Sequence, residues 1–155
     1  PVIFVYTGPV RSGKTTALRA RFGADPAAAG LLAPDVDGRR HLLSLASGET
    51  RPLEADAPAD PVAVGRFTFD GAVFAWARAE LATACRAAPA TLIVDEVGPL
   101  ELDGRGLEPA VGAAVRLAAS TRVVLVVREG LLDRVLDHYG VRDHARIVRH
   151  APRDA

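Results

Sequence analysis

Hydrophobic and polar positions alternate along the chain in two ways, as short apolar runs typical of buried strands and as longer amphipathic segments typical of helices. The runs that predict strands of a main sheet are Val2–Thr7, Thr91–Val94, Val123–Val127 and, at the end, Arg146–Val148. The predicted helices are Lys14–Phe22, Gly71–Ala87, Leu107–Ala119 and Leu131–Tyr139. Strands that are apolar on both faces and alternate with helices predict a three-layer α/β fold. Its sheet is mostly parallel and has helices on both faces.

A different pattern separates the first two predicted helices. Three short β-rich segments, joined by turn signals at Asp37-Gly38 and Ser47-Gly48, predict a short antiparallel meander inserted in the fold: Leu31–Val36, His41–Ala46 and Arg51–Glu54. A loop is predicted at Ala55–Pro61 and a further strand at Gly65–Phe69, after which Asp70 caps the next helix. The chain shows no internal repeat and no linker, so residues 1–155 are predicted to form a single domain.

Composition narrows the class of protein. The formal net charge is zero, which indicates no nucleic-acid partner and no anionic membrane. Apolar runs are too short to span a bilayer and no targeting leader is recognised, so we expect a cytoplasmic protein. The single cysteine excludes a disulfide within the chain. Nothing in the composition identifies a protein partner.

The chemistry begins where the first apolar run ends. Residues Gly8–Thr15 fit G-x-x-x-x-G-K-[ST], the phosphate-binding loop, in which backbone N–H groups and a helix N-terminus face an anion. Lys14 is the only lysine of the chain, and its slim ammonium suits the β- and γ-phosphates better than a planar guanidinium. The predicted nucleotide-binding residues are Gly8, Pro9, Val10, Arg11, Ser12, Gly13, Lys14, Thr15 and Thr16.

A pair of acids ends the second apolar run. In proteins with a phosphate-binding loop, an aspartate at this place holds Mg²⁺, so Asp95 and the hydroxyl of Thr15 are the predicted metal ligands. Glu96 is then placed to orient and deprotonate an attacking water, and Lys14 to assist as a catalytic cation. The other interpretation is an Asp-Glu pair that only caps the strand in solvent.

Two further residues have open roles. Arg128 follows the third apolar run, where it either stabilises the γ-phosphate as an arginine finger from the same chain or pairs with Glu129 at the surface. Glu101 either holds the loop after the acid pair in place or is an ordinary carboxylate near a helix.

The chain resembles the small nucleoside-triphosphatases first associated with thermophiles, whose human relative is called the cancer-related nucleoside-triphosphatase. The resemblance rests on T-G-x-x-x-x-G-K-T-T (Thr7–Thr16), G-R-F-T-F-D (Gly65–Asp70) and D-E-V-G-P-L-E-L (Asp95–Leu102), and it covers essentially the whole chain. It implies a P-loop NTPase fold and Mg²⁺-dependent hydrolysis of ATP, GTP and other nucleoside triphosphates. One departure is at Ala33–Asp37, where the family often has T-x-E-V-R, so contacts made there by that glutamate and arginine do not carry over.

Two other functions use the same loop. A small-molecule or nucleotide kinase needs a mobile, arginine-bearing lid, and the candidate lid Ala55–Val64 contains no arginine. A slow nucleotide-dependent switch would be read by a partner. No N-K-x-D guanine motif is present, which is consistent with weak discrimination between bases.

Overall fold

The most apolar segments of the chain form the centre of a mixed sheet. The computed structural model describes residues 3–9 and 12–150. In the described part of the chain, the parallel strands of this sheet are, in spatial order, β10 (Ala145–Arg149), β1 (Ile3–Gly8), β9 (Arg122–Arg128), β8 (Thr91–Val97) and β2 (Ala28–Leu32). The side chains of β8 and β9 are almost all buried, which explains why these runs are apolar on both faces.

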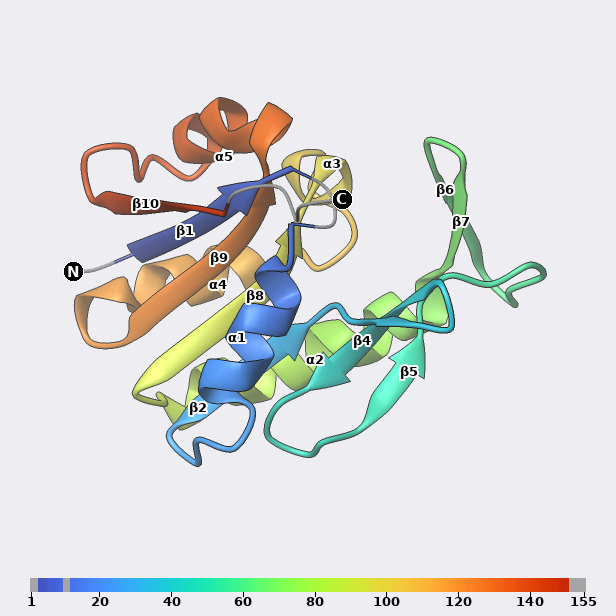
Figure 1. Cartoon of the computed structure of the whole chain (residues 1–155), viewed down its shortest axis with the longest axis horizontal. Helices are drawn as coiled ribbons and strands as arrows, with labels where there is room; N and C mark the ends of the chain where they lie inside the picture. Colours follow the sequence, from blue (N-terminus) through green and yellow to red (C-terminus); the bar gives the residue numbers. More distant parts are fainter. Residues whose placement is uncertain (1–2, 10–11, 151–155) are drawn as a thin grey trace.

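Helices cover both faces, as predicted (Figure 1). On one face, α1 (Lys14–Phe22) packs Leu18 and Phe22 against the sheet. On the other face lie α2 (Gly71–Ala87), α4 (Ala110–Arg116) and α5 (Leu132–His138). None of the helices in the described residues is long and apolar enough to cross a membrane.

The predicted bounds agree with the structure for two of these helices and differ for the other two. The bounds of α1 and α2 are as predicted, and the Asp70 side chain accepts the N–H of Ala72 as the cap of α2. The predicted helix Leu107–Ala119 is too long, because the N–H of Leu107 is bonded to the Glu101 carboxylate outside the helix. Its last turn is the 3₁₀ segment η1 (Leu117–Ala119), and the predicted start of α5 belongs to the 3₁₀ segment η2 (Glu129–Leu131).

The predicted antiparallel meander is present, but one of its strands was misassigned. Strand β4 (Arg39–Ser44) pairs antiparallel with β2, with β3 (Asp35–Val36) and with β5 (Thr50–Pro52). The predicted strand Leu31–Val36 is therefore wrong, because Leu31 and Leu32 complete β2 of the main sheet. The start of β2 is rich in alanine and glycine, which are weak strand formers. Gly30 is required there, since a Cβ atom would overlap the Ile93 carbonyl of β8.

A hairpin was also missed. Strands β6 (Pro61–Val64) and β7 (Phe67–Asp70) form a two-stranded ribbon that stands away from the main sheet (Figure 1). The first of these strands lies inside the predicted candidate lid, Ala55–Val64. Their turn is Gly65-Arg66, so the projecting unit does carry an arginine. A short helix, α3 (Pro99–Leu102), follows β8 and was not predicted.

Candidate functional site

Three neighbouring strands place the predicted site residues at one edge of the sheet. Strand β1 ends at Gly8, β9 ends at Arg128, and β8 carries the acid pair close to its end. Because the strands are parallel, their carboxyl ends lie at the same edge, where ligands bind in open α/β sheets. Strand β9 lies between β1 and β8, and Arg128 pairs in register with Gly8. Arg128 therefore arises between the phosphate-binding loop and the acid pair.

The loop encloses the lysine. Gly13 has a left-handed conformation (φ +88°) at the N-cap of α1, which favours glycine over any residue with a side chain. The Lys14 ammonium is buried and donates hydrogen bonds to the carbonyls of Gly8 (3.1 Å) and Pro9 (2.9 Å) and to Ser12 Oγ (3.5 Å). Burial lowers the pKa of Lys14, an effect that the nearby Glu96 and Asp95 carboxylates oppose. The loop thus holds a desolvated cation among backbone groups.

Thr15 and Asp95 join the loop to the acid pair. Thr15 Oγ1 donates a hydrogen bond of 2.6 Å to Asp95 Oδ2, across 80 positions of sequence. The same oxygen accepts the N–H of Ala33 at 3.1 Å, and Asp95 is only 1% exposed. Burial raises the pKa of Asp95 to about 6, while the hydrogen bond from Thr15 acts in the opposite direction.

These two side chains fit a magnesium ion. A hydroxyl and a carboxylate oxygen in direct contact are hard oxygen donors, and Mg²⁺ in proteins commonly has one or two carboxylate ligands, waters and substrate phosphates. Residues 3–9 and 12–150 contain no cluster of three or more His, Cys, Asp or Glu that could hold a metal by itself. One hydroxyl and one carboxylate fill only part of the coordination sphere of Mg²⁺, which waters and substrate phosphates commonly complete.

Glu96 lies between two arginines. Its Oε1 is 3.4 Å from Arg40 Nη1 and 3.6 Å from Arg128 Nη2. The register of β8 against β9 shifts between Asp95 and Val97, so Glu96 leaves the regular ladder at this point. The carboxylate is mostly shielded, with 16% of its side chain exposed. A shielded carboxylate beside two cations is suited to act close to a bound anion.

Glu101 holds the segment that follows the acid pair. Its Oε1 accepts the N–H of Gly98 at 2.8 Å and its Oε2 accepts the N–H of Leu107 at 2.9 Å. The side chain is 4% exposed, and burial raises the pKa of Glu101 to about 7 although both hydrogen bonds lower it. One buried carboxylate thus ties the end of β8 to the segment before α4.

The comparisons with known proteins agree with this geometry. The model of the family described as NTPase matches residues 3–154. The chain belongs to this NTPase family. The crystal structure of THEP1 from the hyperthermophile Aquifex aeolicus is similar to this NTPase-family chain, with a TM-score of 0.77 and 19% identity over 97% of this chain and 91% of that one. No curated protein sequence matches the chain.

The NTPase family assignment confirms the resemblance and the fold class predicted from the sequence. The structure brings five predicted site residues of this NTPase-family chain to one edge: Lys14, Thr15, Asp95, Glu96 and Arg128. Gly8, Pro9, Ser12 and Gly13 surround the lysine or cap α1, and Thr16 follows in its first turn. Val10 and Arg11, also predicted to bind nucleotide, lie outside the described residues.

One residue of the site was not predicted. Arg40 lies in the meander just after Ala33–Asp37, the segment where the family's glutamate and arginine contacts do not carry over, and its guanidinium reaches Glu96. The available signal was the Arg39-Arg40 pair directly after the Asp37-Gly38 turn. The predicted alternative for Arg128 was a surface arginine paired with Glu129, and only the pairing is wrong, because the Arg128 side chain is 40% exposed. The partner of Arg128 is Glu96, and Glu129 pairs with Arg149 at 2.9 Å.

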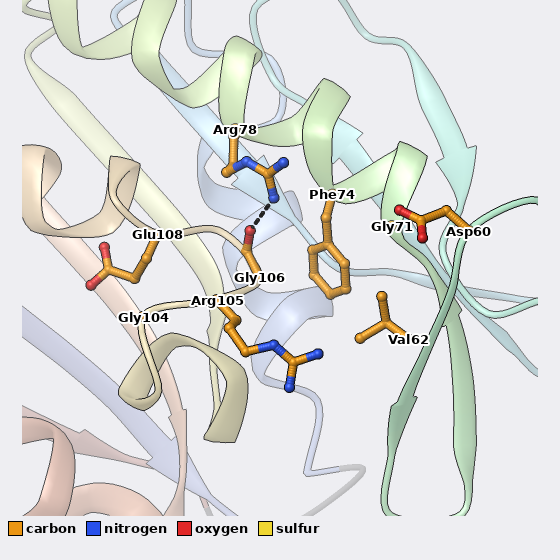
Figure 2. A pocket seen from close by; sticks show the side chains of 9 residues that line it. All are labelled: Asp60, Val62, Gly71, Phe74, Arg78, Gly104, Arg105, Gly106 and Glu108. Atoms are coloured by element: carbon orange, nitrogen blue, oxygen red, sulfur yellow. Dashed lines mark hydrogen bonds between the residues drawn. The ribbon is translucent and has the colours of Figure 1, made fainter.

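A separate hollow lies beside the hairpin of this NTPase-family chain (Figure 2). It has a volume of about 330 Å³, and residues of β6, the start of α2 and the Gly104–Glu108 segment line it. Figure 2 shows the Phe74 ring and Val62 on one side and Arg105 on the other, while Arg78 donates a 2.6 Å hydrogen bond to the Gly106 carbonyl. Among the described residues, none of the phosphate-binding loop or of the acid pair lines this hollow.

Proposed function

We propose that the chain hydrolyses nucleoside 5′-triphosphates to the diphosphate and inorganic phosphate, with Mg²⁺ as cofactor and with weak discrimination between bases. Membership of the NTPase family supports nucleoside-triphosphatase activity in general. The observation that carries the proposal is the 2.6 Å hydrogen bond between Thr15 and Asp95, because it sets the phosphate-binding loop directly against the acid pair.

In the binding step, the phosphate-binding loop holds the phosphates of the nucleotide. Backbone N–H groups of the loop and of the first turn of α1 bind the phosphates, and Lys14 exchanges its carbonyl partners for β- and γ-phosphate oxygens. Thr15 and Asp95 would hold the magnesium ion, which would supply positive charge that offsets the charge of the phosphates.

In the chemical step, Glu96 accepts the proton of the attacking water. Its carboxylate accepts a proton from water as the water oxygen bonds to the γ-phosphorus and the bond from that phosphorus to the β,γ-bridging oxygen breaks. The diphosphate leaves with the bridging oxygen, and the phosphoryl group leaves as inorganic phosphate. Arg128, which arises between the loop and Glu96, stabilises the charge that develops on the transferred group.

Weak base discrimination is proposed because the chain has no guanine-specific motif. The only lysine is in the phosphate-binding loop, so an N-K-x-D guanine site is not possible in this sequence. The similarity to THEP1, at 19% identity, supports the fold.

The test is phosphate release from MgATP, MgGTP, MgCTP and MgUTP by the protein alone. We expect release from all four, no release when EDTA replaces Mg²⁺, and loss of release in Glu96→Gln. Rates that differ by more than about 100-fold between bases would contradict weak discrimination. Tight binding without release would favour a slow nucleotide-dependent switch.

Phosphoryl transfer to another acceptor stays the second candidate because of the hairpin. The expectation that a lid would lack arginine applied to Ala55–Val64, but the projecting unit is Pro61–Asp70, with Arg66 in its turn. The same assay with nucleosides, nucleoside monophosphates and sugars added separates the two functions. A kinase would convert the acceptor to its phosphate ester and release little phosphate without it, whereas a hydrolase would be indifferent to the acceptor.

A further inference from the structure

The meander contributes a positively charged side chain, Arg40, to the site. This arginine belongs to neither the phosphate-binding loop nor the acid pair. Arg40 Nη1 lies 3.4 Å from Glu96 Oε1, the same oxygen that Arg128 approaches to 3.6 Å. The two arginines come from different elements, β4 and the end of β9. Two guanidinium groups thus meet one carboxylate oxygen, although a single ion pair would already neutralise its charge.

The backbone of Arg40 is fixed from several sides. Its N–H donates to Glu54 Oε1 at 3.3 Å, and its carbonyl accepts the N–H groups of Leu53 (3.0 Å) and Glu54 (3.1 Å). The side chain is 26% exposed, so it is partly desolvated. Such an anchored, half-buried guanidinium binds an anion more strongly than an arginine on a mobile surface loop does.

The neighbouring arginine shows that this placement is specific. Arg39 lies next to Arg40 on the same strand but pairs with Asp56 at 2.8 Å, and these two side chains are 44% and 87% exposed. Adjacent residues of a strand point to opposite faces, so only one of the two can face Glu96. Arg39 is therefore a matched control for Arg40 in residue type, strand and neighbourhood.

We propose that Arg40 contacts the γ-phosphate of a bound nucleoside triphosphate, and that it holds the Glu96 carboxylate only when no triphosphate is present. This inference rests on the proposed function, which places Glu96 beside the water that attacks the γ-phosphorus. A group that reaches the oxygen of that base also lies within reach of the γ-phosphate. The γ-phosphate carries more charge than one carboxylate and offers several oxygens to a planar guanidinium, so it attracts Arg40 more strongly.

The exchange has a consequence for the base. While Arg40 and Arg128 are paired with Oε1, the lone pairs that must accept the water proton are engaged by cations. Transfer of Arg40 to the γ-phosphate leaves that oxygen more available to water. A diphosphate has no γ-phosphate, so it leaves the Arg40–Glu96 ion pair in place. The expected signature of Arg40 is therefore a preference for triphosphate over diphosphate.

The experiment compares the affinities of MgADP and of Mg-β,γ-imido-ATP, which is not hydrolysed, for the parent protein, Arg40→Ala and Arg39→Ala. In Arg40→Ala we expect affinity for the imido analogue to fall about tenfold or more, the size typical of a lost charge-assisted hydrogen bond. We expect MgADP affinity to stay within about twofold of the parent. In Arg39→Ala both affinities should stay at the parent values.

An unchanged ratio of the two affinities in Arg40→Ala overturns the proposal, whether both values stay at the parent level or both fall together. Arg40→Gln, which keeps most of the side-chain length, carries the same expectation and replaces the alanine variant if that variant does not fold. The result is separable from the proposed function, because the binding ratio needs no turnover. Absence of phosphate release from every triphosphate by the parent would contradict the hydrolase and leave this ratio measurable.

Discussion

At the scale of single residues, Lys14 is the position where side-chain geometry matters most. The buried ammonium fits between the Gly8 and Pro9 carbonyls inside a tight loop. We predict that Lys14→Ala lowers the affinity for MgATP roughly 10–100-fold, as for the loss of a charged hydrogen bond, with the far-UV circular dichroism unchanged. Isothermal titration calorimetry measures this directly.

The informative partner variant is Lys14→Arg. It keeps the positive charge but needs more room than the loop provides, so we expect it to bind and turn over MgATP nearly as poorly as the alanine variant. Turnover by Lys14→Arg at the parent rate would show that the loop holds the cation less tightly than the hydrogen bonds indicate.

The acid pair allows two roles to be separated by substitutions that preserve size. Asp95→Asn should weaken Mg²⁺-dependent nucleotide binding as well as turnover, because Asp95 is assigned to the metal. Glu96→Gln should spare MgATP binding and slow phosphate release by ~10²–10⁴-fold, the usual effect of losing a general base. Filter binding with labelled ATP, beside a phosphate-release assay, distinguishes the two patterns. Parent-rate hydrolysis by Glu96→Gln would exclude the mechanism proposed here.

Site residues that belong to short sequence motifs were predictable, whereas a residue placed only by the tertiary fold was not. Lys14, Thr15 and the acid pair belong to short motifs with a mechanism behind each position, so the sequence alone predicted them. Arg40 has no such motif. Its contact with Glu96 follows from the pairing of β4 with β2, which brings a residue of the meander to within 3.4 Å of that carboxylate.

At the scale of elements, the position of β9 between β1 and β8 determines what Arg128 can reach. We predict that Arg128→Ala lowers the turnover of MgATP on the order of 10²-fold while MgADP affinity changes little, because charge on the transferred group grows only during transfer. Arg122→Ala at the opposite end of the same strand is the control, and it should keep the parent rate. If Arg128→Ala and Arg122→Ala have equal rates, Arg128 serves only the Glu96 ion pair.

The segment tied by Glu101 gives a prediction about pH and stability. Its folded pKa of about 7 lies above the ordinary value of 4.5, so the folded state holds the proton more tightly than the unfolded state does. The contribution of Glu101 to stability is therefore fully present below pH 4.5 and is lost as pH rises through about 7. Glu101→Gln lacks this dependence and loses one of two backbone acceptors.

The measurement is urea unfolding of the parent and of Glu101→Gln between pH 5 and pH 8. We expect the parent to be the more stable protein at pH 5 by about 1–3 kcal/mol, the usual cost of an unpaired buried donor, and the difference to shrink toward pH 8. A difference that stays constant or grows with pH would contradict the raised pKa of Glu101.

Elements were predictable where one physical signal dominated. Helix α2 combines an Asp70 cap with an apolar face, and its bounds were correct. Strand β2 starts with alanine and glycine, so its place in the sheet depends on the close approach of Gly30 to β8, a tertiary contact that local propensity does not encode. The β6–β7 hairpin was missed because Pro61 and the loop composition before it masked a short strand.

At the scale of the whole molecule, the sequence predicted the layers better than the connections. Apolar runs and amphipathic helices were enough to predict a parallel sheet covered on both faces, and the family model and the similarity to THEP1 bear out that fold class. The order of the strands was not predicted. That order brings the loop after β1, the end of β8 and the meander to a common edge. The site is therefore formed by residues from several strands and their connections.

A site shared by several elements leads to a prediction that the chain unfolds cooperatively. The assignment of residues 1–155 to a single domain stays a prediction, and it requires one unfolding transition seen equally by circular dichroism and by the single tryptophan, Trp76.

Nucleotide bound at the sheet edge should stabilise the whole domain against unfolding. With Glu96→Gln, which is expected to retain MgATP, a ligand concentration of about 100 times Kd adds about 2.7 kcal/mol. For a domain of this size, that raises Tm by roughly 5–10 °C. Differential scanning calorimetry with and without MgATP measures the shift. Two separate transitions, of which MgATP moves only one, would show that the chain folds as more than one unit.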